Sequence, residues 1–116
     1  MSLFERIDTI CLKVSNVEKA SSWYQDVLGF TESFKDKNYR ILAINNSAVP
    51  ITIEEGEINP SPEQVYPIFY TKNIEAAYEN LKEKAVTVSE IQMDGVNQFF
   101  DFYDLDGNRL QACFWK

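Results

Sequence analysis

The sequence predicts an α+β fold built from two βαβββ modules, and three observations support this fold class. Residues 15–30 have the pattern of a capped amphipathic helix with a predicted strand on either side. A polar connector interrupts the chain near its middle, and the same order of elements follows it. At 116 residues the chain is long enough to fold as one domain without metal or disulfide support.

The first predicted helix follows from its two ends and its apolar stripe. Ser15 and Glu18 have the spacing of a capping box, so we expect the N-cap at Ser15. Gly29 predicts the helix end, because glycine adopts positive φ without a Cβ clash. Between them, apolar residues recur in steps of three and four: Val17, Ala20, Trp23, Tyr24, Val27 and Leu28. This stripe needs a sheet to cover.

Strands surround this helix in the first module, which covers about residues 6–55. The polar residues 35–38 are expected to form a turn between two of these strands. Apolar alternation predicts the strands of this module at residues 7–14, 30–34, 39–44 and 51–54. The predicted order is therefore strand, helix and three strands.

Residues 56–64 form the predicted connector. One glycine and two prolines lie there among charged and polar residues, a composition typical of a loop. Beyond it, Asn73 takes the place in the sequence pattern that Asn16 has in the first module, and Glu75 the place of Glu18. The correspondence indicates an internal repeat.

The second module, about residues 65–116, repeats the order of the first. Residues 65–70 predict a strand, and Asn73 is expected to cap a helix that reaches Ala85. Three further strands are predicted at residues 86–91, 98–103 and 110–115. A strand and a helix can recur by chance in an α+β protein, but the shared order of all five elements favours a repeat.

Composition excludes several classes of partner. A net charge of −7 argues against binding to nucleic acid or to anionic membranes, since both select basic surfaces. No apolar run approaches the roughly 20 residues of a membrane-spanning helix, and no signal-peptide pattern precedes the first strand. Cys11 and Cys113 lack the spacing of a metal or redox motif, so we expect reduced thiols and a cytoplasmic protein.

Strand alternation separates a face expected to lie under a helix from a face expected to line a cleft. The first face is aliphatic, whereas the second mixes small polar, aromatic and acidic side chains, as small-molecule sites do. The ligand-binding residues that we predict on this second face are Thr9, Cys11, Thr52, Glu54, Tyr66, Tyr70, Phe100, Phe102, Gln111 and Trp115.

Phe100 and Phe102 enter this set only through an assumed strand register. Pairing Asp104 with Arg109 across the last turn would bring both phenylalanines onto the cleft face. The same register turns Asp101 toward a helix, which is unfavourable for a carboxylate away from a sheet edge. The aromatic residues of the set could equally belong to the core or to a subunit interface.

Four sequence motifs carry a resemblance to a known family: Leu12-x-Val14-x-Asn16, Trp23-Tyr24-x-x-Val27-Leu28-Gly29-Phe30, Asn73-Ile74-Glu75-Ala76-Ala77 and Asp104-Leu105-Asp106-Gly107-Asn108-Arg109-Leu110. They resemble the vicinal oxygen chelate superfamily, which includes glyoxalase I, bleomycin- and fosfomycin-resistance proteins and extradiol dioxygenases. The resemblance implies one domain over residues 1–116, whose modules form a curled mixed sheet around a cleft with a helix outside each module. It also implies a homodimer.

Enzymes of that superfamily hold a divalent metal through His, Glu or Gln side chains on four strands. The matched motifs place the corresponding positions at Thr9, Thr52, Tyr66 and Gln111. Neutral hydroxyls and one carboxamide offer a divalent cation neither charge nor imidazole, and the chain has no histidine. Bringing Glu54 into the set would not complete it. We therefore expect no metal, no cofactor and no metal-dependent glyoxalase, fosfomycin-modifying or dioxygenase activity.

Three functions remain open. The first is a metal-free small-molecule-binding protein of the glyoxalase/bleomycin-resistance type, with an aromatic or amphipathic ligand that could be cationic. The second is a lyase- or isomerase-type enzyme with Glu54 as general base and Tyr66 or Tyr70 as proton donor. The third is a non-catalytic structural or regulatory module whose cleft is filled by its own side chains or by a partner chain.

Ala85 departs from the family's pattern, in which glycine usually ends the second helix. If the backbone needs positive φ at this position, the strain at an alanine is on the order of 1 kcal/mol. Replacing Ala85 with glycine would then stabilise the fold.

Overall fold

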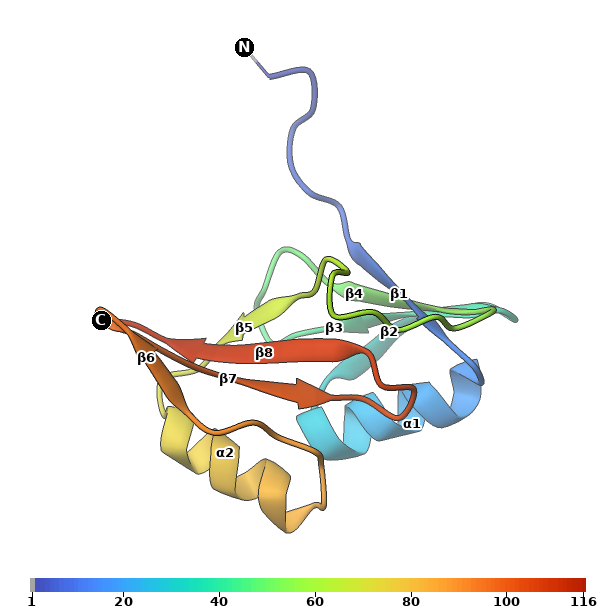
Figure 1. The fold of residues 1–116 in the computed structure, drawn as a ribbon. Coiled ribbons are helices and arrows are strands. Elements are labelled where there is room, and N and C mark those ends of the chain that lie inside the picture. The colour runs from blue at the N-terminus through green and yellow to red at the C-terminus, as the bar shows by residue number, and fades with distance from the viewer. Residues whose placement is uncertain (1) are drawn as a thin grey trace. The chain divides into compact units, whose positions relative to one another are not determined.

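The computed structural model describes residues 2–116, and the chain divides into two compact units, Met1–Ile58 and Asn59–Lys116. Each unit contains one helix and one four-stranded mixed sheet, as Figure 1 shows. The α+β prediction, with a helix and four strands in each module, is thereby confirmed.

The first unit follows the predicted order of elements. They are β1 (Ile10–Val14), α1 (Val17–Leu28), β2 (Thr31–Lys35), β3 (Tyr39–Ala43) and β4 (Ile51–Glu55). The strands lie side by side in the order β1-β4-β3-β2, with β1 and β4 parallel and the other pairs antiparallel. The crossover from β1 to β4 carries α1, which packs against β2, β3 and β4.

Alternate residues of these strands point toward α1 and form the core of the first unit. Ile53 of β4 and Leu42 of β3 are fully buried, as is Tyr24 of α1. The Trp23 ring meets the Tyr24 ring edge-on, with centroids 5.0 Å apart, and the Phe30 ring stacks on Tyr24 at a centroid distance of 6.0 Å. The apolar stripe predicted from the sequence therefore covers its sheet.

The second unit has the same topology with shorter outer strands. Its elements are β5 (Ile68–Tyr70), α2 (Ile74–Glu83), β6 (Gln92–Asp94), β7 (Asn97–Tyr103) and β8 (Arg109–Phe114). The strand order is β5-β8-β7-β6, with β5 and β8 parallel, and α2 packs against β7 and β8. The parallel pairs β1·β4 and β5·β8 are equivalent in the two units.

An asparagine caps each helix. The Asn16 carboxamide oxygen accepts a hydrogen bond from the Lys19 backbone N–H at 2.9 Å, and Asn73 accepts one from Ala76 at 3.0 Å. The prediction that Ser15 caps the first helix is wrong by one residue, because an extended asparagine at position 16 reaches the third N–H of the helix instead. The cap predicted at Asn73 is confirmed.

A left-handed residue follows each helix. Gly29 ends α1 with φ = 76°, as predicted. Ala85 lies just beyond α2 with φ = 61°, so an alanine does adopt the positive φ that favours glycine. The end of α2 therefore carries local backbone strain that the end of α1 avoids.

The prediction of a strand at residues 86–91 is wrong. This segment forms a single bridge, between Val88 and Phe102, and the strand lies instead at Gln92–Asp94. Gly95 and Val96 form the two-residue loop of a β6–β7 hairpin, with Gly95 at φ = 62°, a turn signal that the sequence interpretation overlooked. The strands predicted at residues 7–14 and 65–70 are also shorter, beginning at Ile10 and Ile68.

Neither helix in the described part of the chain combines the length and the apolar character that crossing a membrane requires.

Candidate functional site

The pairing of β7 with β8 decides which side chains of the second unit face away from its helix. The register that we predicted, with Asp104 opposite Arg109, is wrong by one residue. The observed pairs are Phe100 with Ala112, Asp101 with Gln111, Phe102 with Leu110 and Tyr103 with Arg109. A one-residue slip exchanges the two faces of a strand, so the side chains assigned to each face of β7 are reversed.

Phe100 and Phe102 consequently belong to the core and not to the predicted ligand-binding face. Both are buried, and the Phe100 ring meets Tyr78 of α2 edge-on, with centroids 5.2 Å apart. The centroid of the Phe102 ring lies 6.0 Å from that of Phe100 and 6.3 Å from that of Phe69 in β5. At these two positions the alternative that the aromatic residues belong to the core is therefore the correct one.

Asp101 and Tyr103 occupy the face that the two phenylalanines were expected to occupy. Together with Arg109 and Gln111 of β8 they form the polar part of the sheet face that points away from α2. We call this face of each sheet, turned away from the helix of its unit, the helix-distal face. The sequence interpretation missed Asp101, Tyr103 and Arg109 as site residues. The unfavourable burial of Asp101 under a helix in the assumed register was the signal that could have identified them.

Asp101 is the centre of a continuous polar chain on this face. Its Oδ1 accepts a hydrogen bond from Gln111 Nε2 at 2.9 Å, and its Oδ2 lies 3.0 Å from Arg109 Nη2 in an ion pair. The Asp101 and Gln111 side chains are largely shielded from solvent. The carboxylate therefore fixes the orientation of both neighbours.

Arg109 is held by two further features. Its guanidinium carbon lies 3.9 Å from the centroid of the Tyr66 ring, a close cation–π contact. The hydrogen bond to Asp101 raises the pKa of Arg109 above its ordinary value, so the side chain stays charged. Its Nε is buried and has no hydrogen-bond partner among the described residues.

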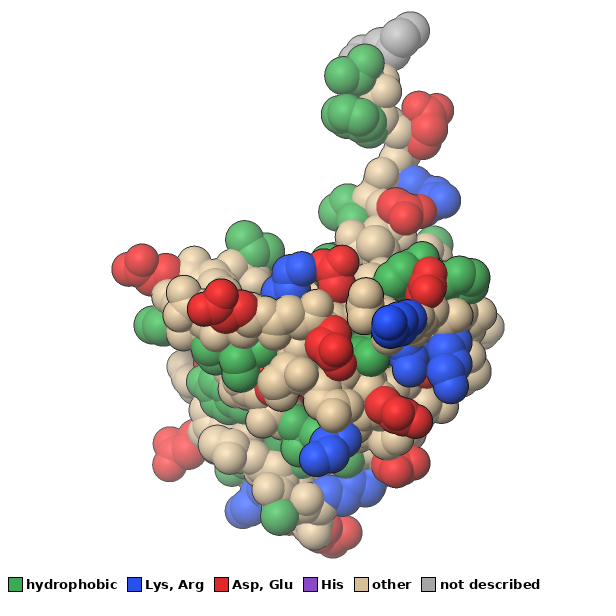
Figure 2. All heavy atoms as spheres, turned by 90° about the vertical axis from the view of Figure 1, so that its right-hand side faces the viewer, with side chains coloured by type: hydrophobic (Ala, Val, Ile, Leu, Met, Phe, Trp, Pro, Cys, Tyr) green, Lys and Arg blue, Asp and Glu red, His purple; other side chains and the backbone are tan. Residues whose placement is uncertain are grey.

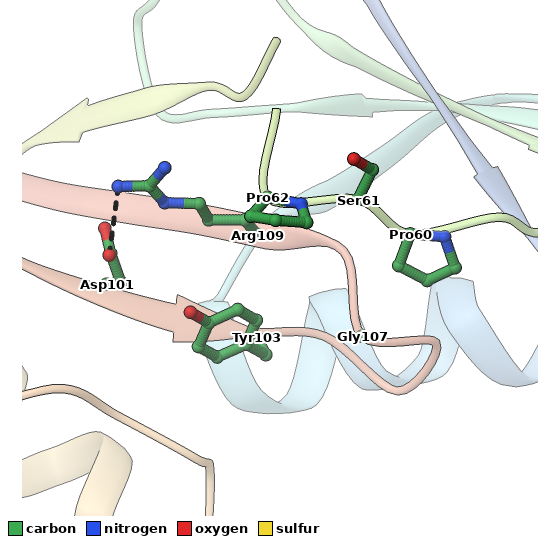
Figure 3. A pocket seen from close by; sticks show the side chains of 7 residues that line it. All are labelled: Pro60, Ser61, Pro62, Asp101, Tyr103, Gly107 and Arg109. Atoms are coloured by element: carbon green, nitrogen blue, oxygen red, sulfur yellow. Dashed lines mark ion pairs between the residues drawn. The ribbon is translucent and has the colours of Figure 1, made fainter. Parts of the chain in front are cut away.

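A pocket of about 400 Å³ opens beside this polar chain. Figure 3 shows the Pro60–Pro62 segment on one side, the Tyr103 ring on the other, and the Asp101–Arg109 pair at one end. Gly107 lies in the β7–β8 turn beneath Pro60, and a Cβ there would come within 3.7 Å of the Pro60 ring. The pocket thus has flat apolar walls and a charged, internally paired end.

The helix-distal face of the first unit has a different polar arrangement. Thr9 Oγ1 lies 2.8 Å from Thr52 Oγ1 and donates to the Pro50 carbonyl oxygen at 2.9 Å. A hydroxyl has a single proton, so the Thr52 hydroxyl donates to Thr9 when Thr9 donates to Pro50. The two hydroxyls predicted at this face are therefore brought together and satisfy one another.

Glu54 and Cys11 lie on the same face, close to Lys13. Lys13 Nζ forms an ion pair with Glu54 Oε1, and this hydrogen bond raises the pKa of Lys13. Burial, followed by the negative charge of Glu54, raises the pKa of the Cys11 thiol, although part of that side chain is exposed. The Glu54 carboxylate is therefore already engaged by Lys13.

Tyr70 and Trp115 form an exposed aromatic pair at the end of the second sheet. The Tyr70 hydroxyl donates to the Trp115 carbonyl oxygen at 3.1 Å, and the two ring centroids are 5.5 Å apart. Each of these residues is about half exposed, at 51% and 54%. Cys113 beside them is a free, buried thiol whose pKa is raised by burial.

The polar cluster on the helix side of the first unit is structural. Arg40 is almost completely buried, and its Nε lies 3.0 Å from Glu32 Oε1. Glu32 Oε1 also accepts a hydrogen bond from Ser21 of α1 at 2.8 Å, while Arg40 Nη1 donates to the Asp36 and Tyr39 carbonyl oxygens. The ion pair thus joins α1 to the β2–β3 turn.

Comparison with known proteins places the chain in a family. The family model of the Glyoxalase/Bleomycin resistance protein/Dioxygenase superfamily matches residues 6–112. The chain belongs to this superfamily. The resemblance stated from the four motifs is confirmed, and the fold of the glyoxalase superfamily accounts for the repeated units.

Several solved structures share this fold at low sequence identity. The antibiotic-binding protein TnmS3 from Streptomyces sp. CB03234 is 17% identical, with all of both chains covered and a TM-score of 0.86. The fosfomycin-resistance protein FosX from Listeria monocytogenes is 17% identical over 98% of this chain and 96% of its own, with a TM-score of 0.83. A superfamily member from Sphaerobacter thermophilus DSM 20745 is 22% identical over 97% and 99%, with a TM-score of 0.83. No curated protein matches the sequence significantly.

The residues at the metal-ligand positions expected from the motif resemblance do not fit a metal. Thr9 and Thr52 are hydrogen-bonded to each other, Gln111 is bonded to Asp101, and Tyr66 packs against Arg109. Among residues 2–116 no three His, Cys, Asp or Glu side chains come together as a ligand set. Neutral donors already engaged within the protein give a divalent cation no compensating charge.

Proposed function

We propose that this member of the glyoxalase superfamily is a metal-free small-molecule-binding protein whose ligand is aromatic or amphipathic. The binding residues that we propose are Asp101, Tyr103 and Arg109, which share a strand face with Gln111, together with the residues predicted from the sequence: Thr9, Cys11, Thr52, Glu54, Tyr66, Tyr70, Gln111 and Trp115. Homodimerisation and a cytoplasmic location remain predictions.

One observation carries the proposal: the polar side chains at the expected metal-ligand positions are bonded to other protein groups. The Thr9–Thr52 hydroxyl pair at 2.8 Å and the Gln111–Asp101 hydrogen bond at 2.9 Å satisfy these groups without a cation. A face whose polar groups are already paired, and which carries tyrosine rings, favours flat apolar ligands that accept few hydrogen bonds.

The charges on the two helix-distal faces argue against a strict preference for cations. Lys13 neutralises Glu54 in the first unit, and Arg109 neutralises Asp101 in the second. Figure 2 shows acidic and basic side chains interleaved on the face of the molecule that it presents. The net charge of −7 therefore does not become a concentrated negative site at these positions.

The two alternative functions receive less support. An enzyme with Glu54 as general base would first have to break the ion pair with Lys13, because the ammonium already binds the carboxylate. A module with a completely filled site would leave no room beside Asp101 and Arg109, where the second unit has a pocket of about 400 Å³.

The proposal is tested by metal analysis and by ligand binding on the same purified protein. We expect less than 0.1 equivalent of transition metal by mass spectrometry, an arbitrary bound that is roughly a tenth of the stoichiometric content of a metal enzyme. Thermal shifts with a panel of aromatic compounds should be unchanged by EDTA. A stoichiometric metal, or binding that EDTA abolishes, would overturn the metal-free proposal, and a panel without a single binder would overturn the binding function.

A further inference from the structure

We propose that the pocket between the Pro60–Pro62 segment and Tyr103 binds a neutral, planar aromatic group with a carbonyl acceptor at its edge, and that Arg109 selects it. This inference rests on the proposed binding function and specifies the ligand class at one site. Aromatic amides and aromatic ketones have this chemistry.

The shape of the pocket favours a flat ring. Its walls are the pyrrolidine rings of Pro60 and Pro62 and the phenol ring of Tyr103, which Figure 3 shows on opposite sides of the space. A volume of about 400 Å³ lies within the range of roughly 300–1,000 Å³ of small-molecule sites. An aromatic ring between such walls gains contact on both faces while losing few rotatable bonds.

The Pro60–Pro62 wall is braced by hydrogen bonds of its own. Gln64 Oε1 accepts from the Ser61 backbone N–H at 3.3 Å, Gln64 Nε2 donates to the Asn59 carbonyl oxygen at 3.1 Å, and the Gln64 N–H donates to the Ser61 carbonyl oxygen at 3.1 Å. These bonds close a compact turn within residues 59–64. The wall is thereby formed before a ligand arrives, which lowers the entropic cost of binding.

Arg109 supplies the polar end of the pocket, and three neighbouring side chains orient it. Asp101 holds Nη2 at 3.0 Å, Gln111 holds Asp101 at 2.9 Å, and the Tyr66 ring lies against the guanidinium at 3.9 Å. Nε is buried without a hydrogen-bond partner in the described part of the chain. A buried donor without an acceptor costs free energy, and a ligand carbonyl bound along this edge would recover it after a small shift of the side chain.

Because Asp101 and Arg109 neutralise each other, a ligand with an uncharged polar edge fits this end of the pocket best. An anionic ligand would have to compete with Asp101 for the guanidinium, and a cationic ligand would have to compete with Arg109 for the carboxylate. Either ion would also lose its hydration on entering the pocket. A neutral hydrogen-bond acceptor on the ligand can bind while Asp101 and Arg109 stay paired with each other.

Three matched probes test this class by isothermal titration calorimetry: 1-naphthamide, 1-naphthoate and 1-naphthylmethylammonium. They share a ring system and differ in the charge of one substituent. We expect 1-naphthamide to bind the wild-type protein most tightly. A tighter 1-naphthoate or 1-naphthylmethylammonium complex would overturn the neutral class.

Two variants test the role of Arg109. Arg109→Met keeps the length of the side chain and removes its donors, so 1-naphthamide affinity should fall by roughly 10- to 100-fold, as for a lost charge-assisted hydrogen bond. Asp101→Asn leaves the guanidinium without its carboxylate, so the preference should change from 1-naphthamide to 1-naphthoate. This change of preference is a gain of binding, which a variant damaged in folding would not show.

Lys82→Met is the matched control. Lys82 also makes a cation–π contact in the second unit, with its Nζ 5.2 Å from the Tyr78 ring centroid, but it lies on α2 and does not line the pocket. It should bind 1-naphthamide as the wild-type protein does.

The outcomes separate this inference from the proposed function. Binding of 1-naphthamide that Arg109→Met leaves unchanged would overturn the role of Arg109 while the binding function stands. The same holds if none of the three probes binds while other aromatic compounds in the panel do. If no compound of any kind binds, both proposals fail.

Discussion

The two units of this chain have the same topology but different polar faces. In each unit a helix covers one face of a sheet whose parallel strand pair is equivalent, β1·β4 in the first and β5·β8 in the second. The helix-facing sides are alike: Ile53 and Leu42 are buried in one unit, and Leu110 and Phe100 in the other. The helix-distal sides diverge, because side chains there need not fill a core and are free to carry different chemistry.

The divergence is clearest in the two acid–base pairs. Lys13 and Glu54 are each about half exposed, whereas Asp101 and Arg109 are mostly shielded from solvent and are joined to Gln111. Water screens the attraction between the charges of an exposed ion pair. In an ion pair that is shielded from solvent and has an additional hydrogen bond, the two side chains are held in one orientation. The second unit is therefore the better candidate for specific recognition.

Phe100→Ala should have the largest effect on stability, because Phe100 belongs to the core. We expect a loss of about 3–5 kcal/mol in the free energy of unfolding, measured by urea denaturation. Trp115→Ala, at a half-exposed position predicted for the same ligand face, should cost far less. Equal losses in the two variants would contradict the assignment of Phe100 to the core and Trp115 to the surface.

Asp101→Ala should come next, because it leaves Arg109 and the buried Gln111 without a shared partner. A loss of about 1–3 kcal/mol is expected in the same denaturation experiment. The corresponding change in the first unit, Glu54→Ala, removes an exposed pair and should alter the midpoint much less. If Glu54→Ala proved the more damaging, the contrast between the two faces would be refuted.

The helix ends provide a matched pair of smaller effects. Ala85→Gly should stabilise the protein by about 1 kcal/mol, and Gly29→Ala should destabilise it by about the same amount. A Cβ at Gly29 would meet no atom within 4 Å, so its cost comes from the positive φ alone. Melting temperatures measured by circular dichroism would show the opposite signs, and two shifts of the same sign would exclude left-handed strain as their cause.

The two thiols should differ in reactivity without much change in stability. The pKa of each is raised above 9.0, so at pH 7–8 both are almost entirely protonated and alkylation should be slow. Exposed Cys11 should react first, faster as the pH rises through 9, while buried Cys113 should react fully only in urea. Intact-mass measurements after iodoacetamide treatment would count the modified thiols, and rapid modification of Cys113 in the folded protein would contradict its burial.

Raised thiol pKa values also predict the direction of the pH effect on stability. The folded state keeps its thiol protons to a higher pH than the unfolded chain does, so the unfolded chain is the first to release them as the pH rises. Stability should therefore be unaffected by these groups below about pH 8 and should fall as the pH rises through 9 and above. Cys113→Ala should reduce this fall.

Local signals in the sequence were sufficient for most of the fold. Gly29, Asn73 and the apolar stripe of α1 act within a few residues, and each was predicted in its observed role. The strand was misplaced to residues 86–91 because the apolar pattern there was followed and the turn signal of Gly95 was overlooked. Where two local signals compete, pairing with a neighbouring strand decides between them.

The candidate site was only partly accessible from the sequence. Thr9, Thr52, Glu54 and Gln111 were assigned to helix-distal faces, where the structure places them. Their partners could not be assigned from the sequence, because the Lys13–Glu54 and Thr9–Thr52 contacts join residues about 40 positions apart in the chain. Such contacts depend on how strands align in space and not on local periodicity.

By itself, the sequence of this protein determined the repeated βαβββ order, the second helix cap and the absence of histidine, because these depend on composition and short-range spacing. Tertiary structure alone decided the β7–β8 register, and with it whether phenylalanines or an aspartate, a tyrosine and an arginine face away from the helix. A register shift of one residue leaves the pattern of a strand almost unchanged but reverses its faces. The polar chain from Gln111 through Asp101 to Arg109 exists because of that single choice.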